Sequence, residues 1–427
     1  MRQNIFSAMI QASASLAIAF LSIAIFRYLT PDQVALLRQH YFVPFALICA
    51  FSPANQNYLR SILFSRAQEI SVRDDINSLV IVQLVTGGLL LAAILLSIST
   101  SGAHLSWLNA LALAVALIFV LARTIVTGVL EFRGDYSASI ILNNSGSAIP
   151  YFAAFSFLVI SGFDVFYIST IVLNTIGVLL VLIIASRISG AGVLKMPEWA
   201  GAEFKFVFRR YLSLSLISVG SVVVYQGVEF CLYNYTAYDK KEVANYALVF
   251  SISAIVRQII LTAVQPLERE QGGAQAVKVL MFGEVTRPVA VEIVVYLILF
   301  GAVLALPAIL ISMFPQFNKA PIFVAPIMLG VLGSAIQQVY SVRMIARART
   351  GFLGSSQVVL AVSCIFAVLL LNSSISLVAM VWLTSGFVWI RGCIVIPLKA
   401  EMNYGRPSLK LWGARAALSA TLFQYYF

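Results

Sequence analysis

Two ionisable residues stand deep inside long apolar segments of the sequence, where charge is costly and usually serves a function. Arg257 lies within the segment 243–266, and its planar guanidinium offers paired donors that match phosphate oxygens. Glu229 lies within the segment 211–236 and either takes up protons or neutralises an arginine. For Arg257 the alternative to anion binding is a structural pair with Glu229 or another acid. Both pairs of alternatives stay open from the sequence.

Further polar side chains follow one face of the first and the seventh apolar segments, at steps of three, four or seven residues. Such a face points towards a partner helix or a water-filled cavity, because lipid cannot satisfy polar groups. For the serines alone, close helix packing is the favoured interpretation. The candidate cavity residues are Gln11, Ser15, Tyr225 and Gln258.

Three more charged residues lie nearer to segment ends. Arg60 follows a run of amides and could help to admit an anion from the cytoplasmic side, although the positive-inside rule explains it equally well. Arg123 and Glu292 are expected close to the inner surface, where long side chains reach the interface. Arg123 and Arg60 join Arg257 as candidate ligands of an anion.

The elements that must position these residues are membrane helices. The chain has 427 residues, of which 61% are hydrophobic and only 11% charged, whereas an average soluble protein carries roughly 25% charged residues. The net charge of +11 comes from basic residues in short gaps between apolar runs, which argues against nucleic acid as a partner. The four cysteines lack metal-ligand spacing, and we expect no metal or cofactor.

Runs of roughly 20 apolar residues match the length of a membrane-spanning helix. Twelve such runs are expected at 5–26, 41–59, 77–99, 105–130, 138–160, 164–186, 211–236, 243–266, 288–313, 321–342, 355–371 and 375–397. Lys and Arg concentrate in alternate connections and in both tails, which predicts that both termini are cytoplasmic. The sequence therefore predicts a multi-pass protein of a bacterial inner membrane.

The longest inner connection divides the expected helices into two groups of six. The predicted organisation is an N-terminal lobe at 1–190, a cytoplasmic connection at 191–208, a C-terminal lobe at 209–398 and a tail at 399–427. In the tail, 409–427 is expected to form an interfacial helix rather than another span. Prolines inside the expected helices should bend or break them, namely Pro44, Pro53, Pro150, Pro307 and Pro326.

The turns after the first and seventh segments are alike, with an aromatic helix end, a short polar turn and a Val-Ala start of the next helix. The first includes Arg27-Tyr28-Leu29-Thr30-Pro31-Asp32-Gln33-Val34-Ala35, and the second includes Lys241-Glu242-Val243-Ala244-Asn245-Tyr246. The stretch Gly128-Val129-Leu130-Glu131-Phe132-Arg133-Gly134-Asp135-Tyr136 with the later Asn143-Asn144 is also distinctive. These motifs resemble those of polysaccharide flippases of the Wzx type, in the superfamily that includes the MATE exporters. Ala stands where that family usually has Gly.

This resemblance implies an all-α membrane protein with two six-helix lobes around a central cavity. It also implies movement of a polyprenyl-pyrophosphate-linked oligosaccharide, such as an O-antigen, capsule or exopolysaccharide unit, from the inner to the outer leaflet. Arg257 is then the expected ligand of the diphosphate, and Glu229 the candidate for ion coupling. Membrane lipids, a polysaccharide polymerase and chain-length proteins are the candidate partners.

Two other classes of function compete with this interpretation. A drug exporter of the MATE type should have an acidic or aromatic cavity, whereas the mid-membrane arginine favours an anionic substrate. A membrane enzyme of polysaccharide assembly would need an intramembrane His near an acid or Arg, a large outer loop or an acidic metal cluster. The chain has only His40 and His104, both near segment ends, and Asp74-Asp75 is its only adjacent acidic pair. We therefore expect a transporter and not an enzyme.

Overall fold

The computed structural model describes residues 13, 17–18, 20–51, 72–100, 106–132, 135–160, 162–189, 215–271, 286–346 and 350–401. These residues form helices joined by short turns, with no strand among them. Seven helices of this part are long and apolar enough to span a membrane, and each coincides with one of the expected spans. The expected all-α membrane fold is thereby confirmed, and the total of twelve spans stays a prediction.

The chain forms two compact units, residues 1–235 and 236–427, which are described separately. The first unit extends beyond the connection 191–208 because the seventh expected span packs against helices of the first unit. The predicted lobes 1–190 and 209–398 follow the order of the helices along the chain and stay a prediction.

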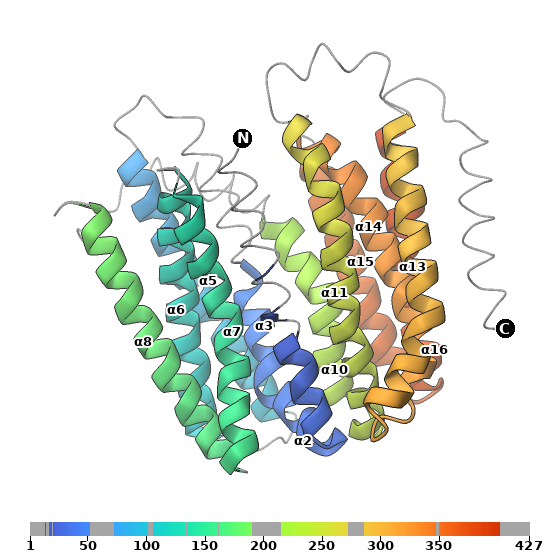
Figure 1. Ribbon diagram of the computed structural model, residues 1–427, viewed down its shortest axis with the longest axis horizontal. Helices are drawn as coiled ribbons and strands as arrows, with labels where there is room; N and C mark the ends of the chain where they lie inside the picture. Colours follow the sequence, from blue (N-terminus) through green and yellow to red (C-terminus); the bar gives the residue numbers. More distant parts are fainter. Residues whose placement is uncertain are drawn as a thin grey trace. The chain divides into compact units, whose positions relative to one another are not determined.

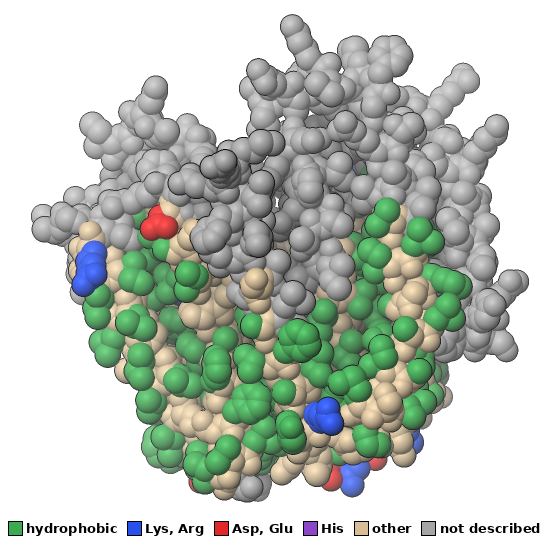
Figure 2. All heavy atoms as spheres, in the orientation of Figure 1, with side chains coloured by type: hydrophobic (Ala, Val, Ile, Leu, Met, Phe, Trp, Pro, Cys, Tyr) green, Lys and Arg blue, Asp and Glu red, His purple; other side chains and the backbone are tan. Residues whose placement is uncertain are grey.

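Three long helices, α6, α7 and α8, pack against one another in the first unit, with α5 beside α6 (Figure 1). Their bounds are Val72–Thr100 for α5, Trp107–Phe132 for α6, Tyr136–Ile160 for α7 and Phe163–Ser189 for α8. Phe119, Leu142 and Val181 are among the residues of their shared core. The outer face of α8 is exposed and apolar, as expected of a helix that contacts lipid. Figure 2 shows apolar side chains over most of the described surface in that view.

The helix after the first turn begins ten residues earlier than the expected span 41–59. It runs through α2 (Pro31–Leu37), the π-helical η1 (Arg38–Phe42), α3 (Val43–Ile48) and the 3-10 turn η2 (Cys49–Phe51). Thr30 caps it by accepting from the Gln33 backbone N–H, while the Gln33 side chain accepts from the Thr30 backbone N–H. With Pro31 at the first helical position, this capping box fixes the helix start. Arg38, expected in the outer connection, therefore lies inside a helix.

The seventh expected span contributes η3 (Val223–Gly227), a π-helical segment, and α10 (Val228–Asn234). Both contact α3, and α10 also contacts η1. At the end of α10, the Tyr235 hydroxyl donates to the Ser97 carbonyl on α5 at 3.0 Å. These contacts place the end of this helix in the first unit.

The second unit is built around α14, which contacts α11, α13 and α16. The bounds are Lys240–Gln271 for α11, Thr286–Met313 for α13, Ala320–Phe323 for the 3-10 turn η4, Val324–Ala346 for α14, Thr350–Leu371 for α15, Leu377–Trp389 for α16, Ile390–Val395 for the π-helical η5 and Ile396–Glu401 for α17. The membrane-length apolar stretch Ala320–Gln338, which includes most of α14, is 72% buried inside the protein. The corresponding stretch of α13, Val294–Met313, is only 28% buried. The central helix of the unit is thus α14, and α13 is peripheral.

Side chains of the connecting turns tie the second unit together. The Asp239 carboxylate accepts from the Lys241 backbone N–H at 3.0 Å at the start of α11. Tyr238 donates from its hydroxyl to the Ile375 carbonyl at 2.8 Å. Lys319 donates to Glu242 at 2.6 Å, and this hydrogen bond raises the pKa of the Lys319 ammonium. The first turn of α11 is therefore anchored to two other connections.

The prolines have smaller effects than expected. Pro150 and Pro307 lie inside α7 and α13, which continue as α-helices through them, so no break occurs there and the expected bend stays a prediction. Pro44 follows a π-helical segment and Pro326 follows a 3-10 turn, where the hydrogen-bond pattern already changes. Membrane helices tolerate proline in general because neighbouring helices and local adjustments can satisfy the freed carbonyl groups. Pro53 lies outside the described residues.

Helix α14 and the α16–η5 helix meet backbone to backbone at glycines. A Cβ atom at Gly392 would overlap the carbonyl group of Gly333, and one at Gly333 would lie 2.6 Å from the Trp389 Cα. Small residues are what allow membrane helices to approach so closely. Gly386, on the same helix as Gly392, faces open space.

We expect Gly392→Ala to lower the thermal unfolding temperature of the purified protein in detergent, because its new methyl group meets backbone that cannot move aside. Gly386→Ala is the matched control, and it should leave stability unchanged or raise it, since Ala is favoured over Gly in a helix by about 1 kcal/mol. Equal unfolding temperatures for the two variants would contradict the close contact.

Candidate functional site

Arg123 is a buried arginine on α6, with 7% of its surface exposed. Its Nη1 donates to the backbone carbonyl of Asn143 on α7 at 2.6 Å, and the guanidinium lies over the Phe119 ring at 5.7 Å from the centroid. The expectation that Arg123 reaches the membrane interface is wrong. Its side chain points instead into the contact between α6 and α7.

Two glycines make room for this arrangement. A Cβ at Gly146 of α7 would overlap the Arg123 guanidinium, and one at Gly177 of α8 would lie 2.6 Å from the Phe119 ring. The missing side chains form a notch that receives both Phe119 and Arg123. The sequence gives no sign of this notch, because its glycines lie on helices other than that of the arginine.

The charge of Arg123 is not balanced by an acid in the described part of the chain. Its only hydrogen-bond acceptor there is the Asn143 carbonyl, and its Nε is buried without a partner. A buried charge that lacks a counter-charge costs several kcal/mol. An anion beside the guanidinium would supply both the counter-charge and the missing acceptors.

Glu229 on α10 is fully buried and paired with Arg38 of η1. Arg38 donates from Nε to Oε1 and from Nη2 to Oε2 at 2.6 Å, and its side chain is 11% exposed. The two parallel bonds form the strong bidentate geometry of arginine with a carboxylate. Of the alternatives open from the sequence, the structure shows neutralisation of an arginine, and proton coupling by Glu229 stays a prediction.

The residue next to Arg38 strengthens the same contact. Gln39 is buried and donates from its amide to the Asn234 side-chain oxygen at 3.1 Å and to the Tyr233 carbonyl at 3.4 Å. Consecutive side chains of an α-helix diverge by about 100°, and here both neighbours point to α10 from a π-helical turn. Such turns are frequent at functional sites.

The other predicted site residues are more dispersed. Arg257 lies on α11 in the second unit, half-buried, and Gln258 follows it on the same helix. Tyr225 lies in η3 of the first unit and is half-buried. Gln11, Ser15 and Arg60 lie outside the described residues. Their expected roles as cavity residues stay predictions.

Two buried polar contacts of the second unit escaped the sequence analysis. Glu292 on α13 was expected at the interface but is buried, and it accepts from the Tyr340 hydroxyl of α14 at 2.6 Å. Arg391, which lies inside the expected span 375–397, is buried in η5 and donates to Ser356 and to the Leu353 carbonyl. The sequence feature that could have identified both residues as buried is their position inside an apolar stretch.

No group of three or more His, Cys, Asp or Glu residues that could hold a metal ion occurs in the part of the chain that the structure describes. All four cysteines are free thiols. The candidate site chemistry of the described residues is therefore hydrogen bonding and charge, with arginine as the main donor.

We expect Glu229→Gln to lower the free energy of unfolding by about 3–5 kcal/mol, because it leaves Arg38 buried without a counter-charge. Adding Arg38→Met should recover much of this loss, since it removes the stranded charge. Denaturant titration of the purified single and double variants measures both effects. Glu242→Gln, which breaks an exposed pair with Lys319, is the control and should cost less than about 1 kcal/mol.

If Glu229 also carries coupling protons, the stabilised double variant should fold without transporting. Full transport by that double variant would exclude the coupling role. The ion pair would be contradicted if the double variant lost as much stability as the sum of the losses in Glu229→Gln and Arg38→Met alone.

Comparison with solved structures identifies the architecture. An inward-facing multidrug resistance MATE family transporter of the MOP superfamily matches with a TM-score of 0.65 at 16% identity, covering 93% of this chain and 98% of its own. The lipid II flippase MurJ, in an inward closed conformation, matches with 0.67 at 11% identity, covering 98% and 97%.

A MOP superfamily transporter from Pyrococcus furiosus, whose binding pocket has reverse polarity, matches with 0.58 at 12% identity, covering 92% and 94%. No family model and no curated protein matches the sequence. Likeness at these identities establishes the fold alone: the chain is a multi-pass membrane protein with the fold of MATE-type transporters of the MOP superfamily.

Proposed function

We propose that this protein is a flippase that moves a polyprenyl-pyrophosphate-linked oligosaccharide from the cytoplasmic to the outer leaflet of a bacterial inner membrane. The observation that carries the proposal is the buried Arg123, whose charge no acid balances among the described residues. The substrate is an O-antigen, capsule or exopolysaccharide unit, and the protein moves it by alternating access without a catalytic step.

The sign of the charge favours an anionic substrate. A diphosphate carries several negative charges and many acceptor oxygens, and it fits the planar donor fork of arginine. A cationic drug would be repelled by the same group. Arg123 in the first unit and Arg257 in the second are the proposed ligands of the headgroup, with Arg60 near the entrance.

The fold agrees with this proposal without deciding it. One structure of similar fold is a lipid II flippase and another is a multidrug transporter, with nearly equal TM-scores. The solved structure with a pocket of reverse polarity is a precedent for different pocket charges on this fold. Charge rather than fold therefore separates the flippase from the cation exporter. Proposed protein partners are a polysaccharide polymerase and chain-length proteins.

We expect Arg123→Met to reduce transport at least roughly tenfold, because hydrogen bonds to charged groups contribute about 1.5–3 kcal/mol. Arg123→Lys should keep part of the activity, since it retains the charge but loses the fork. The measurement is the outward movement of a fluorescent polyprenyl-diphosphate oligosaccharide in proteoliposomes, with equal amounts of monodisperse protein.

Gly146→Ala offers a variant that leaves the arginine itself unchanged. Its methyl group displaces the guanidinium from Asn143, so transport should fall as it does in Arg123→Met. Gly88→Ala, on α5, adds a methyl group that meets nothing within 4 Å and is the control, which should transport normally. Undiminished transport by Arg123→Met, or transport of cationic dyes in place of the lipid by the wild type, would overturn the proposal.

The proposed role of Arg257 in headgroup binding can be tested in cells that depend on this protein for surface polysaccharide. Arg257→Ala should abolish the polysaccharide, and Arg257→Lys should restore part of it. A side chain that binds phosphate depends mainly on its positive charge and to a lesser extent on the paired donors of the guanidinium. Immunoblots for the protein and for the polysaccharide measure both quantities. Normal polysaccharide in the Ala variant would exclude Arg257 from headgroup binding.

A further inference from the structure

Helix α7 has a polar and aromatic face close to the site at Arg123. Asn144, Ser147 and Tyr151 follow one another at steps of three and four residues, so their side chains lie on one side of the helix. Asn144 and Tyr151 are half-buried, and Ser147 is exposed. These three residues are called the polar face of α7.

The other sides of α7 have different surroundings. Leu142 and Ala153 are buried, and Leu142 belongs to the core shared with α6 and α8. Ile141 and Phe152 are 59% and 53% exposed on a third, apolar side, as expected of residues that contact lipid. Polar residues on a membrane helix usually face a partner helix or a water-filled cavity. The polar face is therefore suited to a polar ligand.

Hydrogen-bonding groups of the polar face are available to such a ligand. The Asn144 amide nitrogen donates to the Ile140 carbonyl of its own helix at 2.9 Å, which leaves the amide oxygen as an acceptor. The hydroxyls of Ser147 and Tyr151 have no hydrogen-bond partner in the part of the chain that the structure describes. Each hydroxyl can both donate and accept.

Tyr151 adds an aromatic surface to these polar groups. Its ring lies 5.4 Å from the Phe42 ring of η1, at an interplanar angle of 33°. A tyrosine combines an apolar ring with a polar tip, and a sugar combines an apolar C–H face with hydroxyls at its edge. None of the three side chains carries a charge. The polar face therefore matches a saccharide better than it matches a diphosphate or a hydrocarbon chain.

The polar face begins next to the proposed diphosphate site. Arg123 donates to the carbonyl of Asn143, the residue before Asn144. From Asn144 to Tyr151 the helix rises by about 10 Å, at 1.5 Å per residue. The expected topology places the start of α7 on the cytoplasmic side, so the polar face extends from the arginine towards the outer side. A sugar attached to a diphosphate at Arg123 would reach it.

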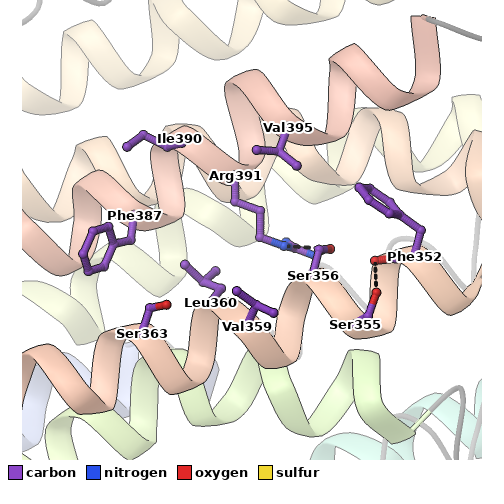
Figure 3. A pocket seen from close by; sticks show the side chains of 10 residues that line it. All are labelled: Phe352, Ser355, Ser356, Val359, Leu360, Ser363, Phe387, Ile390, Arg391 and Val395. Carbon is purple, nitrogen blue, oxygen red and sulfur yellow. Dashed lines mark hydrogen bonds between the residues drawn. The ribbon is translucent and has the colours of Figure 1, made fainter.

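A groove in the second unit, between α15 and the α16–η5 helix, offers different chemistry (Figure 3). Its volume is about 400 Å³, and Val359 and Phe387 are among its apolar lining residues. Ser355 donates to a carbonyl of its own helix at 3.2 Å, and Ser356 accepts hydrogen bonds from Arg391. The polar groups of this groove are thus largely engaged within the second unit, in contrast to those of the polar face of α7.

We propose that the polar face of α7 binds the first sugars of the lipid-linked saccharide, an inference that rests on the proposed flippase function. The sugar next to the diphosphate bonds through its hydroxyls to Asn144 and Ser147, and the following ring packs on Tyr151. This face contributes to the choice of sugar, whereas Arg123 binds the diphosphate that all such lipids share.

The test compares the binding of two lipids to the purified full-length protein by native mass spectrometry. One is the lipid-linked oligosaccharide extracted from cells that make this protein, and the other is polyprenyl diphosphate without sugar. The wild type should bind the first more tightly. Tyr151→Ala should weaken that binding roughly fivefold to tenfold, because it removes an aromatic contact. Its binding of the sugar-free lipid should stay unchanged, which also shows that the variant is folded.

Two exposed serines of α7 provide a matched pair of variants. Ser147→Trp covers the polar face and should remove the advantage of the oligosaccharide-bearing lipid. Ser145→Trp places the same ring on the side of Ile141 and Phe152, and it should bind both lipids as the wild type does. Equal effects of the two tryptophans would overturn the proposal.

The sugar site and the flippase function fail in different ways. If Tyr151→Ala and Ser147→Trp bind the oligosaccharide-bearing lipid as tightly as the wild type, the sugar site is wrong and the flippase function stands. An equal loss for both lipids would assign the polar face to the diphosphate and would also overturn the sugar site. If the wild type binds neither lipid, the flippase function is contradicted and the sugar site falls with it.

Discussion

A carboxylate that stays ionised out of contact with solvent is stabilised most strongly by a cation beside it, and in this protein Arg38 is the cation beside Glu229. Removal of either partner would strand a charge in surroundings that cannot solvate it. Because Arg38 belongs to η1 and Glu229 to α10, the pair holds the seventh expected span against the second. The composition of the first compact unit, which extends to Tyr235, depends on this contact.

The broad architecture could be predicted because it depends on local properties of the chain. Long apolar runs identify spans in any sequence, and the turn Thr30-Pro31-Asp32-Gln33 is a recognisable capping box. This stretch was part of the family resemblance, and the structure shows that its role here is to start a helix. Asp239 caps the corresponding helix of the second unit with one hydrogen bond, from the Lys241 backbone N–H. Such motifs indicate a fold more directly than a function.

Features that depend on tertiary packing could not be predicted. The polar stripe of the seventh span assumes a regular helix, but the π-helical η3 lies between its serines and Glu229. One additional residue rotates everything after it by about 100°. The same irregularity in η1 brings Arg38 and Gln39 together on α10, although the sequence placed Arg38 in a loop.

The residues of the candidate site show the same difference between local features, which the sequence reveals, and features of tertiary packing, which it does not. Arg257 was identified by its depth within an apolar run, a property that can be determined from the sequence alone. The burial of Arg123 arises from the Gly146 notch on another helix, and that of Arg391 from acceptors on α14 and α15. Hydropathy cannot distinguish an arginine that reaches the interface from one enclosed by its neighbours.

The ion pair also has a consequence for how the protein is made. Arg38 and Glu229 are 191 residues apart in the chain. At a synthesis rate of about 5–20 residues per second, Arg38 leaves the ribosome roughly 10–40 s before its partner exists. During that interval an arginine that has no carboxylate cannot enter hydrocarbon without a cost of about 2.5–3.5 kcal/mol. Insertion of the seventh helix brings the carboxylate that offsets this cost, and the first unit, which extends to residue 235, cannot be complete before that step.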